Sequence, residues 1–167
     1  MSQILVMGVS GCGKSTIGSL LADRLGVPFL DADSLHPAAN LAKMSAGVPL
    51  DDEDRWPWLR LVGAALAASP EGTVVACSAL RRTYRDLLRS FAPDLQIVHL
   101  VATREDLAAR MRDREGHFMP VALLDTQLAT LEPLGADEAG VEIDAMRPPD
   151  DIVASALSTL GNPPPHA

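Results

Sequence analysis

Gly8-Val9-Ser10-Gly11-Cys12-Gly13-Lys14-Ser15 has the form G-x-x-x-x-G-K-S and stands between two apolar segments of different periodicity. The run before it, residues 4–7, is apolar throughout and predicts a buried strand. The segment after it, residues 16–25, repeats apolar side chains at helical spacing and stops at Gly26, which predicts a helix. Glycines let such a loop curl so that its N–H groups and the helix N-terminus face phosphate oxygens. The stretch therefore predicts a strand, a phosphate-binding loop and a helix.

The residue types in this loop assign tasks to its positions. Lys14 is expected to reach the β- and γ-phosphates of a nucleoside triphosphate, and the Ser15 hydroxyl to hold Mg²⁺. A glycine-rich turn without function is the alternative, but the fixed positions coincide with the right flanking elements. We therefore expect ATP with Mg²⁺ as the ligand. The expected ATP-binding residues are Gly8, Val9, Ser10, Gly11, Cys12, Gly13, Lys14, Ser15 and Thr16, together with Arg110 and Arg114 farther along the chain.

Length, charge and cysteine usage narrow the class of protein. The 167-residue chain is expected to form one domain over residues 1–160, followed by a disordered tail at 161–167. Its net charge of −8 argues against nucleic acid as a partner, because phosphate backbones are bound by basic surfaces. No apolar run approaches the roughly 20 residues of a membrane helix and no leader is visible, so no membrane association and a cytoplasmic location are expected. Cys12 and Cys77 lack metal-ligand spacing and are expected to be free thiols.

Apolar segments alternate with helical patterns along the whole chain. Strands are predicted at residues 3–7, 28–30, 73–77, 96–101 and 141–143, and helices at 14–25, 40–46, 54–68, 83–90, 104–114, 121–131 and 149–160. Strands that are apolar throughout are typical of a parallel sheet covered on both faces. The prediction is an α/β fold, a three-layer α/β/α sandwich around a five-stranded parallel sheet. Ligands should bind beyond the carboxyl ends of its strands.

Two carboxylates follow the second predicted strand. If the strand continues, Asp31 and Asp33 lie on one face at the carboxyl edge, beside the phosphate loop. Asp31 would then hold Mg²⁺ through water, and Asp33 would accept the proton of an attacking hydroxyl. The alternative is an Asp-rich turn that caps the next helix. The third strand ends in Ser78 instead of the single Asp of many motor and switch NTPases, which favours a small-molecule or nucleotide kinase.

With the loop included, the chain resembles the gluconokinases, ATP-dependent D-gluconate kinases of the adenylate-kinase-like P-loop superfamily. The likeness runs from about residue 4 to about residue 160, and its most specific blocks are Phe29-Leu-Asp-Ala-Asp-Ser-Leu-His-Pro37, Pro57-Trp-Leu59 and Cys77-Ser-Ala-Leu-Arg81. Ala32 stands where the family often has Gly. The resemblance implies transfer of the γ-phosphoryl group of ATP to the 6-hydroxyl of D-gluconate, giving 6-phospho-D-gluconate. It also implies a place in carbohydrate acid catabolism that feeds the pentose phosphate pathway, and a homodimer.

The proposed acceptor predicts the kinds of side chain that should surround it. A carboxylate calls for an arginine fork, a row of hydroxyls for polar side chains, and a primary alcohol for a base. The candidates for substrate binding are Asp33, His36, Arg55, Ser78, Arg81, His117 and Gln127. Arg81 opens an arginine-rich helix, whose alternative role is surface solvation. For Arg55 the alternative is an ion pair with the neighbouring acids.

Residues 112–122 are predicted to be a lid over ATP. Arg110 and Arg114 lie four residues apart on one helical face, and a break containing Gly116 follows. Such a lid would exclude water and bring arginines to the transferring phosphate. An ordinary amphipathic helix with a solvated arginine face is the alternative. The expected catalytic residues are therefore Lys14, Asp33, Arg110 and Arg114, and residues 34–60 are expected to cover the substrate.

Two other functions remain open from the residues alone. Another small-molecule kinase of the same fold, such as a shikimate or nucleoside-monophosphate kinase, also presents acid pairs and arginines. A nucleotide-binding regulatory module would use the same loop without turnover, but it would be expected to lack the acid pair or the lid arginines.

Overall fold

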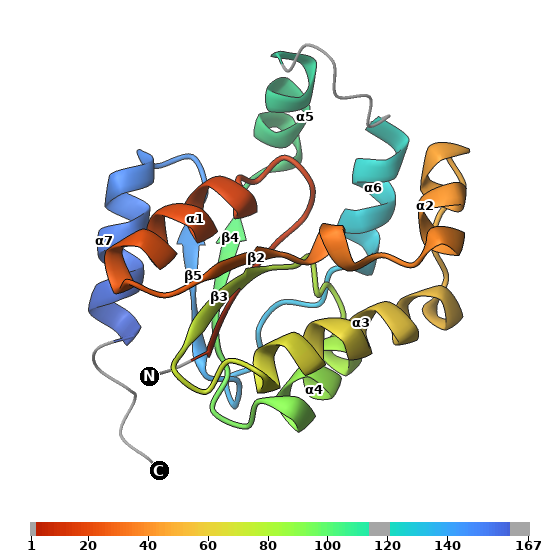
Figure 1. Cartoon of the computed structure of the whole chain (residues 1–167). Coiled ribbons are helices and arrows are strands. Elements are labelled where there is room, and N and C mark those ends of the chain that lie inside the picture. The colour runs from red at the N-terminus through yellow and green to blue at the C-terminus, as the bar shows by residue number, and fades with distance from the viewer. Residues whose placement is uncertain (1–2, 114–120, 161–167) are drawn as a thin grey trace.

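A computed structural model describes residues 3–113 and 121–160, which form one five-stranded sheet with helices on both faces (Figure 1). The strands are β1 (Gln3–Met7), β2 (Phe29–Asp31), β3 (Thr73–Ala76), β4 (Gln96–Val101) and β5 (Gly140–Asp144). They lie in the order β2-β3-β1-β4-β5, and every neighbouring pair is parallel. The predicted parallel α/β fold is therefore confirmed.

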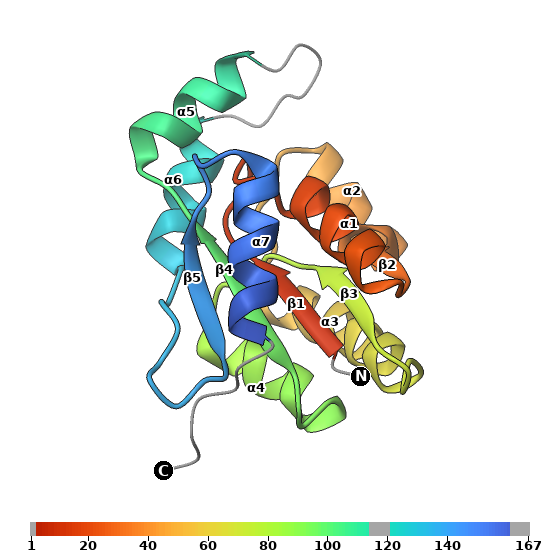
Figure 2. The same ribbon diagram turned by 90° about the vertical axis from the view of Figure 1, so that its left-hand side faces the viewer.

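The helices divide between the two faces of the sheet and its carboxyl edge. They are α1 (Lys14–Leu25), α2 (Ala38–Ser45), α3 (Asp52–Ala67), α4 (Arg82–Phe91), α5 (Arg104–Asp113), α6 (Val121–Thr130) and α7 (Pro149–Leu160), with a 3₁₀ helix, η1 (Ala32–Leu35), after β2. Turning the molecule shows α1 and α7 on one face and α3 and α4 on the other (Figure 2). Most predicted boundaries lie within two residues of these. None of the helices in the described parts of the chain is long and apolar enough to cross a membrane.

The strand pattern explains the two cores. Successive side chains of a strand point to opposite faces of the sheet. Ile4 and Val6 of β1 accordingly pack toward α1 and α7, whereas Leu5 and Met7 pack toward α3 and α4. All four are buried. Because both faces of β1 are covered, its run is apolar throughout, as a central parallel strand requires.

β2 does not continue through both acidic residues, which was the condition for placing Asp31 and Asp33 on one face of a strand. The strand ends at Asp31, whose carboxylate accepts a hydrogen bond from the Asp33 N–H at 3.0 Å. The Ser34 hydroxyl donates to the Asp31 carbonyl at 2.7 Å, and η1 begins at Ala32. Asp31 thus caps a short helix, as the alternative interpretation of this segment had it.

The chain order places a crevice at the end of β1. The connection after β1 runs toward β2 on one side of the sheet, whereas the connection after the neighbouring strand β4 runs toward β5 on the other side. In open parallel sheets, ligands bind at the carboxyl end of the strands where this reversal occurs. The phosphate loop follows β1 at that point.

Candidate functional site

Backbone conformations that favour glycine shape the loop between β1 and α1. Gly13, the residue before α1, has φ +95°, in the left-handed region that side chains disfavour. At Gly8 a Cβ atom would lie 2.7 Å from Cys12 Sγ and 2.8 Å from the Leu100 carbonyl oxygen. Cys12 itself is buried in the core beneath the loop. These positions explain why the loop pattern needs glycine where it has it.

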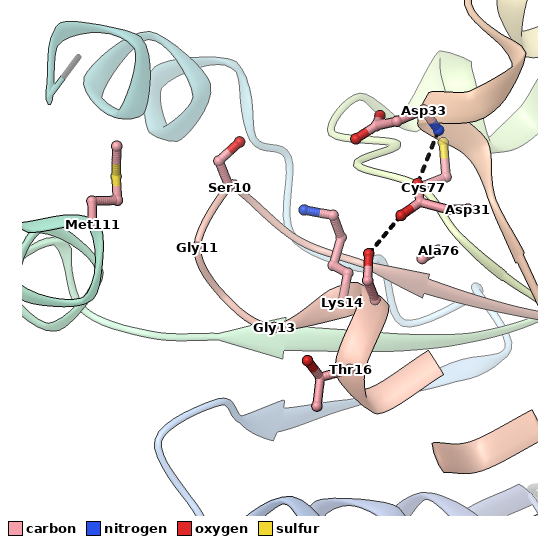
Figure 3. A pocket seen from close by; sticks show the side chains of 11 residues that line it. Ser10, Gly11, Gly13, Lys14, Thr16, Asp31, Asp33, Ala76, Cys77 and Met111 are labelled. Carbon is pink, nitrogen blue, oxygen red and sulfur yellow. Dashed lines mark hydrogen bonds between the residues drawn. The ribbon is translucent and has the colours of Figure 1, made fainter. Parts of the chain in front are cut away.

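A cavity of about 340 Å³ opens above this loop at the carboxyl edge of the sheet (Figure 3). The loop supplies one wall, Asp31 and Asp33 supply another, and Ala76 and Cys77 at the end of β3 lie between them. The Lys14 ammonium points into this space, as does the Asp33 carboxylate. Burial raises the pKa of the Cys77 thiol to about 12, so a neutral thiol stands at this wall. The fold therefore brings the phosphate loop and the two predicted acidic residues, Asp31 and Asp33, into one cavity.

Ser15 and Asp31 meet directly. The Ser15 hydroxyl donates to the Asp31 carboxylate, and their oxygens lie 2.6 Å apart. Among the described residues there is no cluster of three or more His, Cys, Asp or Glu side chains that could hold a metal ion. Mg²⁺ does not need one, because it is commonly held by one or two protein oxygens with phosphate oxygens and water. An oxygen-only pair beside the phosphate loop fits that ion.

Lys14 and Asp33 face each other across the cavity, and their surroundings differ. The Lys14 ammonium donates to the Val9 carbonyl of its own loop at 3.1 Å. The Asp33 side chain is 75% exposed, yet its carboxylate stands inside the cavity. Removal of surrounding water and the neighbouring Asp31 carboxylate raise the pKa of Asp33, and the charges of Lys14 and His36 oppose that rise. A raised pKa suits a carboxylate that takes up a proton.

A second cavity of about 320 Å³ lies on the other side of the loop, toward β5 and α7. Arg110 reaches it from α5. Its Nη2 donates to the Ala145 carbonyl at 2.8 Å, and its Nη1 donates to the loop carbonyls of Gly11 and Cys12 at 3.4 and 3.3 Å. Thr16 lines both cavities, as do two of the loop glycines. The two cavities therefore flank one phosphate loop, and Arg110 belongs to the second.

Gln127 contacts the phosphate loop. Its Oε1 accepts from the Ser10 N–H at 2.8 Å, and its Nε2 donates to the Ser10 hydroxyl at 3.0 Å. This pair of bonds attaches α6 to the loop across 117 residues of sequence. The sequence placed Gln127 among the substrate-binding candidates, and the structure places it against the donor loop.

Ser78 and Arg81 lie in the turn between β3 and α4. Ala79 has φ +43°, a conformation unusual for a residue with a side chain. The turn is fixed by Arg85, whose Nη1 donates to the carbonyls of Ala79 at 3.0 Å and Leu80 at 3.2 Å. Arg81 is exposed, and its side chain makes no hydrogen bond or ion pair with any residue in the described ranges.

Surface solvation does not account for all the arginines of α4. Arg85 is fully buried. Its Nε donates to Glu138 Oε1 at 2.8 Å and its Nη2 to Oε2 at 3.0 Å. Arg89 Nη1 also donates to Glu138 at 2.8 Å, and Arg82 binds Asp137 with two bonds of 2.8 and 2.7 Å. Burial opposes ionisation of Glu138, but hydrogen bonds from Arg85, Gly135 and Arg89 hold its pKa at about 2. Arg81 is thus the arginine of this group that carries no carboxylate partner in the described chain.

Arg55 and His36 come from the segment expected to cover the substrate. Arg55 Nη1 donates to the Tyr84 hydroxyl at 3.0 Å and lies 3.8 Å from Asp52, so the ion pair with a neighbouring acid is present. Tyr84 in turn donates to Asp52. His36 stacks on Trp58 with ring centroids 4.2 Å apart, and its Nε2 lies 3.8 Å from Asp33 Oδ1. The His36 side chain thus adjoins Asp33, and neither His36 nor Arg55 is among the residues that line the cavity.

Two expected site residues, Arg114 and His117, lie outside the described residues, as does most of the expected lid and the expected tail at 161–167. Residues 112 and 113 at the start of the lid and residues 121 and 122 at its end are described, and Asp113 lines the second cavity.

Comparison with known proteins supports the family. A model of the shikimate kinase family matches residues 10–156. A gluconokinase of Gluconobacter oxydans (strain 621H) is 46% identical over 157 residues, covering 92% of this chain and 88% of its own. The thermosensitive gluconokinase of Escherichia coli (strain K12) is 47% identical over 142 residues, covering 83% of this chain and 76% of its own.

The solved structures agree. A gluconokinase from Sinorhizobium meliloti 1021 is 50% identical, superimposes with a TM-score of 0.90, and the match covers 96% of this chain and 91% of that one. The chain belongs to the gluconokinase family of P-loop kinases. Shikimate kinase from Aquifex aeolicus, at 18% identity and a TM-score of 0.61, shares the fold. The family explains why a shikimate kinase model covers most of the chain, because both have the same kinase fold.

The sequence did not predict the buried contacts that hold η1 and the turn after β3. Arg85 and Glu138 are separated by 53 residues, and nothing in the spacing of either one indicates the pair. Trp58 donates its indole N–H to the Ala32 carbonyl at 2.7 Å and so holds η1. The Pro-Trp-Leu block belongs to the resemblance, but only the folded structure shows this contact.

Proposed function

We propose that the protein transfers the γ-phosphoryl group of ATP to the 6-hydroxyl of D-gluconate, giving 6-phospho-D-gluconate and ADP. One observation carries the proposal: the phosphate loop with Lys14 and the acid pair Asp31 and Asp33 line the same cavity. Membership of the gluconokinase family supplies the acceptor. Shikimate kinase shares the fold at only 18% identity, so shikimate is the weaker candidate acceptor.

The two cavities beside the loop suit the two ends of ATP. The triphosphate would lie along the loop, with its γ-phosphate near Lys14 in the first cavity. The nucleoside would enter the second, where Arg110, Ala145 and Pro149 are among the lining residues. Ser15 and Asp31 would hold Mg²⁺, which when bound neutralises phosphate charge. Lys14 would leave the Val9 carbonyl to bind the transferred group.

Asp33 would serve as the base. Phosphoryl transfer needs the nucleophile oriented in line and its proton accepted, and a carboxylate commonly does this in kinases. Asp33 stands across the cavity from Lys14, so an acceptor hydroxyl bound at Asp33 would face the γ-phosphate. Its raised pKa increases its affinity for the proton.

Arg81 would bind the carboxylate of gluconate. It starts from an exposed turn at the carboxyl edge of β3, and it is not bound to a carboxylate of the described chain. A guanidinium binds a carboxylate with two parallel hydrogen bonds. Ser78 in the same turn and Arg55 near Tyr84 would bind hydroxyls farther along the substrate. Gln127 is bound to Ser10, so it would hold the phosphate loop in position and would not itself contact gluconate.

Closure over the site completes the proposal. We expect residues 112–122 to act as a lid that brings Arg114 to the transferring phosphate and His117 toward the substrate. Arg110 would contribute to nucleotide binding from the second cavity. Residues 34–60, which include α2 and the start of α3, would cover the acceptor.

The assembly and location follow from the resemblance. We propose a single domain over residues 1–160, a homodimer and a cytoplasmic enzyme, and the two free buried cysteines fit a reducing compartment. Sedimentation velocity tests the assembly, since a sole species at the chain mass of 17.7 kDa would contradict a dimer.

An acceptor panel tests the function. ADP release would be measured with D-gluconate, shikimate, glycerate, AMP and CMP offered separately to the full chain with ATP and Mg²⁺. D-Gluconate should accelerate ADP release far above the rate without acceptor. Acceleration by shikimate or a nucleotide, with none by gluconate, would refute the proposed acceptor, and no acceleration by any of them would favour a nucleotide-binding regulatory module.

A further inference from the structure

Two buried polar side chains, Asn40 and His36, stand behind Asp33. The His36 side chain is 4% exposed and Asn40 is 3% exposed, and neither lines the cavity. His36 ends η1, and Asn40 lies in the first turn of α2. Burying polar groups costs free energy unless their hydrogen bonds are made, so their contacts should show what this pair does.

The backbone fixes the orientation of the Asn40 amide. Asn40 Nδ2 lies 3.0 Å from the Asp54 carbonyl oxygen. A carbonyl oxygen only accepts hydrogen bonds, so the NH₂ group of Asn40, and not its oxygen, faces Asp54. The same nitrogen lies 3.2 Å from His36 Nδ1. Since an NH₂ group only donates, His36 Nδ1 accepts, and the proton of the neutral imidazole is on Nε2.

The ring nitrogen that carries this proton is the one that lies near Asp33. His36 Nε2 lies 3.8 Å from Asp33 Oδ1. Trp58 holds both partners: its ring stacks on His36 at an interplanar angle of 18°, and its indole N–H binds the Ala32 carbonyl next to Asp33. The contact is longer than a hydrogen bond, and catalytic contacts often shorten when substrate binds.

Burial, more than the surrounding charges, favours the neutral form of the His36 ring. Asp33 faces it from η1 and Arg55 from α3, while the stacked Trp58 carries no charge. Burial lowers the pKa of His36; the Asp33 carboxylate opposes this, and Arg55 adds to it. A neutral N–H can orient a carboxylate without the positive charge that would weaken it as a base.

We propose that Asn40 and His36 form a positioning relay, in which Asn40 fixes the Nε2–H form of His36 and His36 holds one oxygen of Asp33. The other oxygen is then free to accept the proton of the acceptor hydroxyl. The relay rests on the proposed role of Asp33 as base. It also gives His36 a task other than direct contact with substrate.

Nitrogen-15 NMR of the full chain tests the tautomer without measuring activity. The His36 ring signals would be assigned by their absence in His36→Gln. The relay predicts a proton on Nε2 in the wild-type protein and a proton on Nδ1 in Asn40→Asp, whose carboxylate can only accept. A wild-type ring with its proton on Nδ1 would overturn the relay.

Kinetics separate positioning from packing. His36→Gln keeps an N–H donor near the place of Nε2, whereas His36→Leu fills the space without one. The relay predicts that His36→Leu lowers kcat on the order of tenfold to a hundredfold, the scale of a misplaced reacting group. His36→Gln should retain most of the turnover, and the KM for ATP should stay unchanged in both. Equal losses of kcat in the two variants would overturn the relay in favour of packing.

Lys43→Met is the matched control. Lys43 binds Asp54 at 2.6 Å and so joins α2 to α3, as Asn40 does, but it makes no contact with His36. Its loss should leave kcat close to wild type. A loss as large as that of His36→Leu would mean that the attachment of α2, and not the imidazole, is what matters.

A double-mutant cycle separates the relay from the function on which it rests. In an Asp33→Ala background, His36→Leu should cause no further loss of turnover. A full additional loss there would overturn the relay. Unchanged turnover in Asp33→Ala alone would instead overturn the assignment of Asp33 as base.

Discussion

The two sides of the main cavity are built in different ways. The donor side is residues 8–15, one continuous stretch shaped by backbone conformations such as φ +95° at Gly13. The acceptor side joins the end of β2, η1, the start of α3 and the turn after β3, which are far apart in sequence. It is held by long-range bonds such as Trp58 to Ala32 and Arg85 to Ala79. The phosphate-binding loop can thus be specified locally, whereas the site for the acceptor depends on tertiary contacts.

The largest expected effect comes from removing the proposed base of the acceptor side, Asp33. Asp33→Ala should lower kcat by about a hundredfold to ten-thousandfold, the usual contribution of a general base. ATP binding, which belongs to the donor side, should change little, because Asp33 does not belong to the phosphate loop. Steady-state kinetics and calorimetric titration with ATP would measure the two. Unchanged turnover would remove Asp33 as base.

The next effect comes from removing a buried side chain that supports the turn after β3 on the acceptor side. Arg85→Ala leaves Glu138 buried without its main partner, which typically costs about 3–5 kcal/mol of the free energy of unfolding. Arg82→Ala is the matched control, because it removes a half-exposed arginine from the same helix and should cost much less. Urea denaturation of both variants gives the comparison. Similar losses in the two would show that the buried pair does not hold this turn.

A smaller effect separates binding of the substrate from binding of the nucleotide. Arg81→Ala removes an exposed side chain that makes no bond in the described chain, so the stability of the fold should not change. The KM for gluconate should rise roughly tenfold to a hundredfold, as expected for loss of hydrogen bonds to a charged group. The KM for ATP should stay the same. An effect confined to the ATP side would refute the assignment of Arg81 to the substrate.

The last effect concerns pH. Arg85, Gly135 and Arg89 outweigh the cost of burying Glu138, so its pKa falls from 4.5 to about 2 in the folded protein. A lowered pKa in the folded state means that this carboxylate stabilises the fold fully above its ordinary pKa and loses that effect as pH falls toward about 2.

The matched variant for this effect is Glu138→Gln. The difference in free energy of unfolding between wild type and Glu138→Gln should stay constant above pH 4.5 and shrink toward pH 2. Chemical denaturation over this range measures it. A difference independent of pH would mean that the charge of Glu138 does not contribute.

The comparison between the two sides also explains what the sequence could predict. The parallel α/β fold and the donor side followed from apolar strands and from a motif of eight adjacent residues. The turn at Asp31 was predicted only as an alternative, because an Asx cap and a strand end look alike in sequence. The burial of Arg85 could not be predicted, since its partner Glu138 lies in a distant loop and arginine is usually exposed. The role of the Asn40 amide could be inferred only from its two hydrogen-bond acceptors in the folded structure, His36 Nδ1 and the Asp54 carbonyl.

The central claim is that donor and acceptor sides meet so that the 6-hydroxyl of gluconate receives the phosphoryl group. The most direct test is the structure of the product formed from ATP and ¹³C-labelled D-gluconate, read by carbon–phosphorus coupling in NMR. The account predicts coupling to phosphorus from C6 and its neighbour C5 alone. A phosphoryl group on another carbon, or no phosphorylated gluconate at all, would contradict it.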